Sequence, residues 1–544
     1  MSDKIIRRKN MEKTKEEIKS FIEQGKAVLG IEFGSTRIKG VLTDEDHKIL
    51  AVGIHDWENA YENGLWTYSL DAILTGLKSC YASMKNEVKE KYGISVKKLA
   101  AIGISGMMHG YVALDKDGEF LAPFRTWRNT NTAKAAAFLS DLFDFNIPMR
   151  WSISHLYQAI LNGEDHVGKI DYLTTLAGYI HLRLSGERAM GVGEASGMFP
   201  IDSSTVQFDE GMLDKFAALD DVKKYDWDIR KILPKVLPAG EKAGVLTADG
   251  ARLLDESGEL EAGALIAPPE GDAGTGMTAT NSVGVRTGNV SAGTSVFAMV
   301  VTDKPLKKRH EELDMVTTPS GDAVAMVHCN NCTSDINAWA GLFREFAALS
   351  GHEMNAGDVF TLLFNNSEKG DADCGGIINF NTVSGEPVVG LSEGRPMIVR
   401  TPDANVTLAN FVRSCLYGAL ASLKAGCDIL FKEEGVQVDT LYGHGGFFKT
   451  PGVGQRVLSA AMNAPVSVME NAGEGGPWGM AILASYMIYK KDGESLSDYL
   501  NSRVFASVNT STVQPDEAMV KGFDKYMESY KALVEVEKRA SEVF

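Results

Sequence analysis

The sequence predicts an α/β protein with two domains, and three observations lead to this fold class. Buried strands and amphipathic helices alternate through most of the chain, which is typical of mixed sheets covered by helices. The segment 28–43 predicts a strand, a Gly-Ser-Thr turn and a second strand, and the segment 288–301 repeats this plan with Gly-Thr-Ser. A chain of 544 residues also exceeds what one hydrophobic core normally serves. We therefore expect a duplicated fold that closes on one nucleotide.

In the first half, strands are expected at 28–33, 38–43 and 49–55, because each is a short apolar run bounded by turn residues. A helix follows, with Ser69 or Asp71 as its N-cap and one apolar face. That face comprises Ile73, Leu77, Tyr81, Met84 and Val88. Further strands are expected at 100–105 and around 111–114. Residues 12–24 are charged and amphipathic, which predicts an appended helix.

In the second half, the order of elements recurs. Strands flank the second turn, a long helix is expected at about 408–433 and a strand at 440–442. Two more helices are expected at 453–462 and 477–489, and the remaining C-terminal residues have a helical, polar pattern. The expected segments are an N-terminal helical extension (1–26), a first domain (27–285), a second domain (286–490) and a C-terminal helical segment (491–544).

The composition argues against several kinds of partner. The net charge of −17 disfavours nucleic acid and anionic membranes. We find no apolar run long enough to cross a bilayer and no signal peptide, so a cytoplasmic protein is expected. Six cysteines are few for this length and fit reduced thiols. Cys329 and Cys332 have CxxC spacing, but without a second ligand pair two ordinary thiols are favoured over a metal or redox site. The oligomeric state, with a homodimer as one option, stays open.

The turn Gly34-Ser35-Thr36 is a candidate phosphate site. A glycine lets backbone N–H groups approach an anion closely, and the two hydroxyls add donors. Glu32, two residues upstream, indicates a metal held beside that phosphate. An ordinary hairpin is the alternative. The repeat of the plan at Gly293-Thr294-Ser295 favours the phosphate site.

Two further segments could carry chemistry. A strand that ends in glycines presents Met108 and His109, although a core methionine and a satisfied histidine are the favoured interpretation for such a pair. Trp127 is flanked by hydrogen-bonding residues, including Arg128 and Asn129. An indole face packs on sugar C–H groups while such neighbours bind hydroxyls, but a surface loop with one buried tryptophan has the same pattern.

Two further segments complete the candidate chemistry. Asp272 follows Gly271 and is either a helix N-cap or a general base, because phosphoryl transfer to a hydroxyl needs a carboxylate that accepts the proton. The glycine loops at 442–447 and 473–479 allow backbone to lie flat against a purine, although such loops also serve as plain turns.

Taken in this order, the segments from about residue 27 to 490 resemble the FGGY carbohydrate kinases, and within them the ketopentose kinases of the xylulokinase type. The first phosphate motif of that family, Asp-x-Gly-Thr, is matched by Glu32-Phe-Gly-Ser-Thr36, with Lys39 in the basic position. The sugar motif Gly-Gln-Met-His-Gly is matched by Gly106-Met-Met-His-Gly110, and Trp-Asn-Asp by Trp127-Arg-Asn129. The remaining matches are Gly271-Asp272, Gly293-Thr-Ser295, Ser384-Gly-Glu-Pro387, and the adenosine loop at Gly445-Gly446 with Gly475 to Gly479.

The resemblance implies two actin-like (ribonuclease H-like) domains with ATP between them and the sugar deep in the cleft. It implies in-line transfer of the γ-phosphoryl group from magnesium-ATP to the terminal hydroxyl of an open-chain ketose, with Asp272 as the base. The implied sugar ligands are Met108, His109, Trp127, Arg128, Asn129 and Asp272. Glu32 and Asp272 would face Mg²⁺, and the implied ATP ligands are Gly34, Ser35, Thr36, Lys39, Gly293, Thr294, Ser295, Gly445, Gly446, Phe447, Gly475 and Gly476.

The departures from the family pattern concern the sugar more than ATP. Glu32 replaces an aspartate, Met107 replaces a glutamine, and Arg128-Asn129 replaces Asn-Asp. D-Xylulose is the expected substrate and L-ribulose the alternative, because L-ribulokinases carry a basic residue after that tryptophan.

Two other classes on the same fold remain. A non-catalytic nucleotide-binding module of the actin or heat-shock-chaperone kind would lack the sugar residues. An ATPase that activates dehydratases would need cysteines bridging an iron–sulfur cluster and would lack the Gly271-Asp272 segment.

Overall fold

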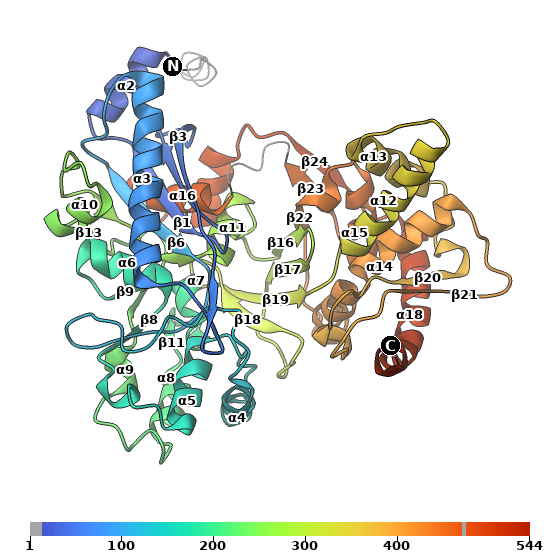
Figure 1. Ribbon diagram of the computed structural model, residues 1–544, viewed down its shortest axis with the longest axis horizontal. Helices are drawn as coiled ribbons and strands as arrows, with labels where there is room; N and C mark the ends of the chain where they lie inside the picture. Colours follow the sequence, from blue (N-terminus) through green and yellow to red (C-terminus); the bar gives the residue numbers. More distant parts are fainter. Residues whose placement is uncertain (1–12, 470–474, 544) are drawn as a thin grey trace. The chain divides into compact units, whose positions relative to one another are not determined.

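The computed structural model describes residues 13–469 and 475–543, and the chain divides into two compact units (Figure 1). Unit 1 contains the described residues of Met1–Asn281, Val316–Asp322 and Gly473–Ala506, and unit 2 those of Ser282–Met315, Ala323–Ala472 and Ser507–Phe544. The expected segments remain a prediction. In the structure the described residues 475–506 group with unit 1, and residues 1–12 of the expected extension lie outside the described residues.

The main sheet of unit 1 has the strand order β13-β14-β6-β1-β2-β3. β1 (Val28–Phe33), β2 (Arg37–Thr43) and β3 (Ile49–Asp56) are antiparallel neighbours. β6 (Ala101–Gly106) runs parallel to β1, and β14 (Leu265–Ile266) and the short β15 (Glu270–Gly271) both run parallel to β6. β13 (Gly244–Val245) closes the edge antiparallel to β14. The strands predicted here are confirmed to within one residue.

The main sheet of unit 2 has the order β18-β19-β17-β16-β22-β23-β24. β16 (Thr287–Ala292), β17 (Val296–Val301) and β19 (Ala323–Cys329) are antiparallel neighbours, and β22 (Thr440–His444) and β23 (Val466–Met469) continue parallel from β16. β24 (Thr510–Val513) is antiparallel to β23, and β18 (Asp314–Thr317) lies beyond β19. Apart from β18, the pairing repeats that of unit 1 strand for strand, which confirms the duplicated α/β fold of the actin-like type.

Helices cover both faces of the sheet of unit 1. α16 (Gly476–Tyr489) packs on β1 so closely that a Cβ at Gly30 would lie 2.1 Å from the Pro477 carbonyl oxygen. Gly40, which pairs with Ile31, faces Cys80 of α3 (Leu70–Tyr92). Since successive strand residues point to opposite faces, α16 and α3 cover opposite sides. The cap by Ser69 and the buried face predicted for α3 are confirmed.

The N-terminal appended helix is also confirmed. α2 (Lys15–Glu23) begins with a capping box between Thr14 and Glu17, and Ile22 is fully buried in the core of unit 1. The other longer helices of unit 1 are α4 (Ala133–Phe143), α5 (Ser152–Asn162), α6 (Leu176–Ser185), α8 (Glu210–Ala217), α10 (Ala248–Leu254) and α11 (Asp272–Ala279).

Unit 2 is built around α14 (Leu408–Asp428), which continues as a π-helical turn over Ile429–Glu433. Contrary to the sequence prediction, this stretch is long and apolar enough to cross a membrane by length and composition. In the structure, 78% of its most apolar window is buried, because α12 (Ser334–Leu349), α13 (Ala356–Ser367) and α15 (Val453–Met462) pack around it. It is the core helix of this unit.

The C-terminal region differs from the prediction of polar helices. Residues 510–513 form strand β24, which the sequence does not reveal because its residues are mostly exposed and polar. α18 (Glu517–Val543) buries Phe523, Tyr526, Met527 and Tyr530 in the core of unit 2. The terminal helix is therefore part of that core.

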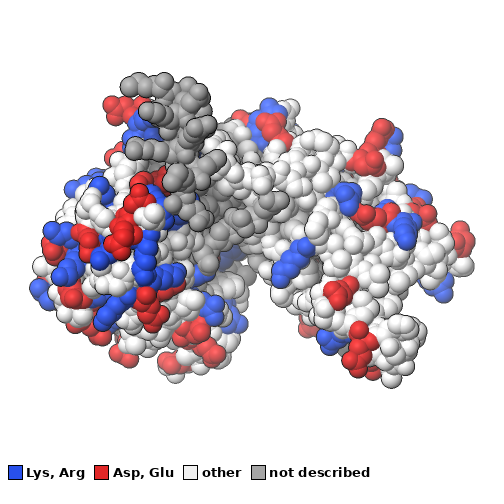
Figure 2. Space-filling model, turned by 90° about the horizontal axis from the view of Figure 1, so that it is seen from above, with Lys and Arg blue, Asp and Glu red and all other residues white. Residues whose placement is uncertain are grey.

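The surface mixes charges of both signs. On the face drawn in Figure 2, acidic and basic side chains are interspersed. With a net charge of −17, acidic residues outnumber basic ones, and exposed ion pairs such as Arg37–Asp56 at 2.6 Å lie among them.

The close approach of α16 to β1 predicts a large effect of one methyl group. Gly30→Ala would place a Cβ against the Pro477 oxygen and 2.6 Å from the Ala481 nitrogen. Thermal unfolding should therefore show that the free energy of unfolding falls by roughly 1–3 kcal/mol or more. Gly341→Ala, in α12 with open space around it, is the control and should be neutral or stabilising. Equal melting temperatures for the Gly30 variant and the wild type would contradict this packing.

Candidate active site

The predicted residues of unit 1 gather where three parallel strands end. In the register, Glu32 of β1 pairs with Ser105 of β6, and Ser105 pairs with Glu270 of β15. The turn 34–36, the segment 107–109 and Asp272 each follow one of these strand ends. Polar residues that follow the carboxyl ends of parallel strands form the usual ligand site of an α/β sheet. The fold therefore brings three of the sequence motifs together at one edge.

Asp272 is the first residue of α11, and the N-cap is Gly271, which forms no side-chain cap. The N-cap interpretation of Asp272 is therefore wrong. Its Oδ1 instead accepts a hydrogen bond of 3.0 Å from the backbone N–H of Met108. The side chain is accessible to solvent, yet protein atoms surround it closely, and this desolvation raises the pKa of Asp272 against the opposing effect of the N–H donors. A carboxylate with a raised pKa thus adjoins the Met-His segment.

Glu32 lies beside Asp272 and shares its environment. Its Oε2 accepts a hydrogen bond of 3.3 Å from the Thr275 hydroxyl of α11. Burial, and then the charge of Asp272, raise the pKa of Glu32 to about 8, while Lys39 on the paired strand opposes this rise. A Cβ at Gly476 would lie 1.4 Å from Oε2, so only a glycine lets α16 begin here.

The two carboxylates fit a magnesium ion only in part. No group of three or more His, Cys, Asp or Glu side chains is placed to hold a metal anywhere in the described ranges 13–469 and 475–543. Mg²⁺ is commonly bound by one or two carboxylates, with waters and substrate phosphates as its other ligands. Glu32 and Asp272 are compatible with such a site.

His109 is held as a neutral imidazole. It has a left-handed φ of 73°, is 5% exposed, and its Nδ1 lies 3.2 Å from the carbonyl oxygen of Gly197. Because a carbonyl only accepts, Nδ1 carries the proton and Nε2 is left as an acceptor. Burial, followed by the charge of Arg150, lowers the pKa of His109 well below its ordinary value. The ring also stacks on Trp151, with 6.3 Å between centroids.

In the loop 127–129, Trp127 contacts the first turn, whereas Arg128 and Asn129 contact other residues of unit 1. Trp127 is 41% exposed and its Nε1–H donates to the Ser35 hydroxyl at 3.3 Å, so the loop contacts the first turn. The guanidinium of Arg128 lies 3.9 Å from the centroid of the Trp66 ring and donates to Asn59. The amide of Asn129 is buried and bonded to backbone groups of Trp66 and Thr126. In this structure Arg128 and Asn129 hold the loop, and their binding of sugar stays a prediction.

The sequence analysis missed two residues that hold the first turn. The Nε1–H of Trp57 donates to the Gly34 carbonyl at 2.7 Å, and the hydroxyl of Tyr68 donates to the Ser35 carbonyl at 2.6 Å. Both side chains are buried, at 7% and 2% exposure. No sequence signal distinguishes them from ordinary core aromatics, because their partners are backbone atoms more than twenty positions away.

The second turn is held within unit 2 by the CxxC loop. The backbone N–H and the hydroxyl of Thr333 both donate to the Gly293 carbonyl, at 3.0 and 2.7 Å, and the N–H of Cys332 donates to the Thr294 carbonyl at 2.9 Å. Cys329 and Cys332 are fully buried free thiols, and burial raises the pKa of Cys332 to about 12. The interpretation of two ordinary thiols is supported, and their loop has a structural task.

The expected adenosine residues lie in two places along the chain. Gly445, Gly446 and Phe447 follow β22 in unit 2, and the ring of Phe447 is fully buried in the core. Gly475 and Gly476 begin α16 in unit 1, while residues 473–474 of that loop lie outside the described residues.

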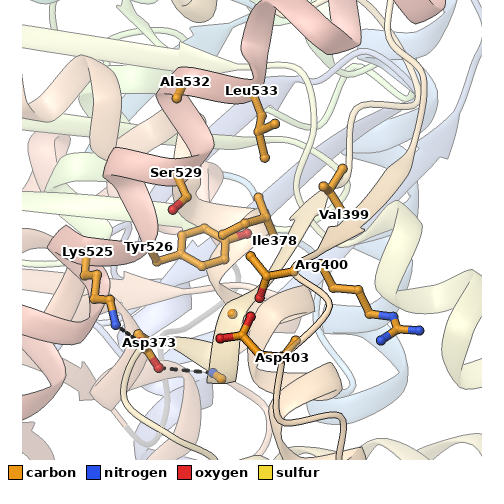
Figure 3. Close-up of a pocket in the computed structure, with 14 residues that line it drawn as sticks. Asp373, Ile378, Val399, Arg400, Asp403, Lys525, Tyr526, Ser529, Ala532 and Leu533 are labelled. Carbon is orange, nitrogen blue, oxygen red and sulfur yellow. Dashed lines mark hydrogen bonds and ion pairs between the residues drawn. The ribbon is translucent and has the colours of Figure 1, made fainter.

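A cavity elsewhere in unit 2 contains none of these residues. It has a volume of about 580 Å³ and lies between α18 and the hairpin of β20 (Ile377–Phe380) and β21 (Met397–Arg400) (Figure 3). Its lining includes an ion pair between Lys525 and Asp373, with Arg400 and Asp403 nearby. The chemistry predicted from the sequence motifs is therefore not at this cavity.

Comparison with known proteins agrees with this geometry. Residues 27–257 match the N-terminal domain of the FGGY family of carbohydrate kinases, and residues 288–488 match its C-terminal domain. A xylulose kinase of Haemophilus influenzae is 22% identical over 517 residues, covering 92% of this chain and 98% of the relative.

Solved structures share the fold. A gluconate kinase from Lactobacillus acidophilus has a TM-score of 0.75 at 18% identity, covering 94% of this chain and 99% of that one. A glycerol kinase from Plasmodium falciparum with ADP has a TM-score of 0.71 at 18% identity, covering 94% and 98%. Since the two family models match residues 27–257 and 288–488 in order, the chain belongs to the FGGY family of carbohydrate kinases.

Proposed function

We propose that this sugar kinase transfers the γ-phosphoryl group of Mg-ATP to the terminal hydroxyl of a ketopentose, with D-xylulose as the first choice. The observation that carries the proposal is the hydrogen bond from the Met108 N–H to Asp272 Oδ1. It fixes a carboxylate of raised pKa beside the segment proposed to bind the sugar. A base whose pKa is raised toward the working pH accepts an alcohol proton more readily than an ordinary aspartate does.

The sugar is proposed to lie against three residues. Asp272 accepts the proton of the attacking hydroxyl, and the Nε2 of His109 accepts a hydrogen bond from another hydroxyl. The exposed face of Trp127 packs against the C–H groups of the carbon chain. Met108 donates its backbone N–H to Asp272, and its side chain packs beside Gly271, the residue before the base.

The nucleotide is proposed to bind through backbone N–H groups and a metal. In unit 1 these residues are the turn Gly34–Thr36, Lys39, Glu32 and the start of α16 at Gly475-Gly476. In unit 2 they are the turn Gly293–Ser295 and the loop Gly445–Phe447. The fold shared with a glycerol kinase that carries ADP supports this assignment. We expect the enzyme to work in the cytoplasm.

One contact in the structure supports the proposed ranking of D-xylulose above L-ribulose. The case for L-ribulose rests on Arg128, whose guanidinium is stacked on Trp66 and bonded to Asn59. To donate a hydrogen bond to a sugar hydroxyl, this arginine would have to give up its contacts with Trp66 and Asn59. The xylulose kinase relative, which spans nearly the whole chain, points in the same direction.

Replacing the proposed base tests the mechanism. Asp272→Asn keeps the shape and can still accept the Met108 hydrogen bond but cannot take the proton, so kcat should fall by roughly 10²–10⁴-fold with sugar and ATP affinity largely kept. Asp220→Asn, whose side chain is fully exposed, is the matched control and should keep full activity. Near-normal turnover of the Asp272 variant would remove this residue from the mechanism.

The pH profile tests the environment of the same carboxylate. Because desolvation by the surrounding protein atoms raises the pKa of Asp272, the inactive protonated form should accumulate, and kcat/KM should fall, at a pH above the ordinary range of an aspartate. Activity is lost as the pH falls through the raised pKa. Glu32, with a pKa of about 8, adds a second acid limb. Because the charge of Asp272 contributes to that raised pKa, the residual activity of Asp272→Asn should keep only the limb due to Glu32, shifted to lower pH. An identical profile in this variant would contradict the assignment.

A panel of substrates tests the sugar. The kcat/KM values for D-xylulose, L-ribulose, D-ribulose, gluconate and glycerol should be compared with ATP in excess, and D-xylulose should be highest. A pocket that bonds a particular hydroxyl strongly rejects an analogue that lacks it. A preference for L-ribulose would change only the ranking, whereas a preference for glycerol or gluconate would overturn the ketopentose assignment.

A further inference from the structure

We propose that Trp57 and Tyr68 are positioning residues that orient the phosphate turn of unit 1, Gly34–Thr36, by holding its carbonyl oxygens away from the ligand. Neither residue belongs to the motifs that predicted the site. The inference rests on the proposed function, because the ligand of the oriented turn is the phosphate of ATP.

The contacts account for every carbonyl of the turn. Trp57 holds two of them, with its Nε1–H 2.7 Å from the oxygen of Gly34 and its backbone N–H 3.1 Å from the oxygen of Thr36. The hydroxyl of Tyr68 lies 2.6 Å from the oxygen of Ser35, the carbonyl between them. Two neighbouring aromatic side chains therefore fix consecutive peptide groups.

Peptide geometry converts these contacts into a direction for the donors. In a trans peptide the C=O and N–H bonds point in opposite directions. When the carbonyls of Gly34 and Ser35 point toward the aromatic pair, the N–H groups of Ser35 and Thr36 must point away from it. A short run of N–H groups held on one side makes an anion-binding concavity. The donors are therefore arranged before any phosphate arrives, which lowers the cost of ordering the turn on binding.

The turn of unit 2 shows the same arrangement with different donors. There the carbonyls of Gly293 and Thr294, the equivalents of Gly34 and Ser35, accept hydrogen bonds from Thr333 and Cys332. The donors are the backbone N–H groups of Thr333 and Cys332 and the hydroxyl of Thr333, so two of the three belong to the backbone. The orientation is thus common to both units, but in unit 1 it depends on side chains and can be removed by substitution.

The aromatic pair is built to keep its position. Trp57 and Tyr68 stack with 4.0 Å between ring centroids and 25° between planes, and Phe33 packs edge-on against Trp57. Burial raises the pKa of Tyr68 to about 12, so its hydroxyl keeps the donated proton throughout the working range of an enzyme. Two rigid side chains with their rotamers fixed by stacking lose little entropy when they hold a loop.

The experiment removes one donor atom at a time from the full chain. Tyr68→Phe deletes only the hydroxyl, and Trp57→Phe deletes the indole N–H while keeping an aromatic ring. Tyr61→Phe is the matched control, because it also deletes one tyrosine hydroxyl. Tyr61 lies in strand β4 (Ala60–Glu62) and is 63% exposed. For each variant the KM for ATP, the KM for the sugar, the inhibition constant of adenosine and the melting temperature are measured.

We expect the KM for ATP to rise roughly 3- to 10-fold in Tyr68→Phe, as for loss of one buried hydrogen bond, and similarly in Trp57→Phe. The sugar KM, adenosine inhibition and the Tyr61→Phe variant should stay within twofold of the wild type. An unchanged ATP KM in both variants, in protein that melts normally, would overturn the inference. Equal losses for ATP, adenosine and sugar would also overturn it, because they would indicate a merely structural role. Wild-type protein that neither binds ATP nor phosphorylates any sugar would instead refute the proposed function.

Discussion

The register of three parallel strands is the constraint on which the site depends. Glu32, Ser105 and Glu270 lie side by side on β1, β6 and β15, so the residue that follows each strand emerges at the same edge. A shift of one position between β6 and β15 would turn the side chains of the shifted strand to the other face of the sheet and separate Asp272 from Met108. Gly30 on β1 permits the packing of the covering helix, since α16 approaches the backbone there more closely than any side chain allows.

The strands, most helices and the order of the motifs could be predicted from the sequence, because each depends on local patterns. Apolar runs bounded by glycines predicted β1, β2 and β6 to within a residue. The cap at Ser69 and the buried face of α3 followed from helical spacing. The proximity of Asp272 to the Met-His segment was expected from the family resemblance alone, and the structure supplies the hydrogen bond between them.

What could not be predicted depends on contacts between distant segments. The polar strand β24 has no hydrophobic alternation and is recognised only by its pairing with β23. Trp57 and Tyr68 look like core residues until their backbone partners are known. The sequence motif predicts Asn129 as a sugar ligand, yet its side-chain amide forms hydrogen bonds with the backbone of Trp66 and Thr126. The CxxC spacing likewise suggests a metal site in sequence, yet in the structure the backbone N–H of Cys332 donates to the Thr294 carbonyl of the second turn.

The placement of α16 in unit 1 has a consequence for how the chain is made. Strand β1 emerges early from the ribosome, but the helix that covers its face at Gly30 begins only at Gly476. Synthesis at roughly 5–20 residues per second separates the two by tens of seconds. During that interval the glycine-lined face of the first sheet is uncovered, and unit 2 also awaits β24 and α18. Neither unit can finish folding during translation of its own first segment, and the enzyme cannot be divided at one peptide bond into two complete halves.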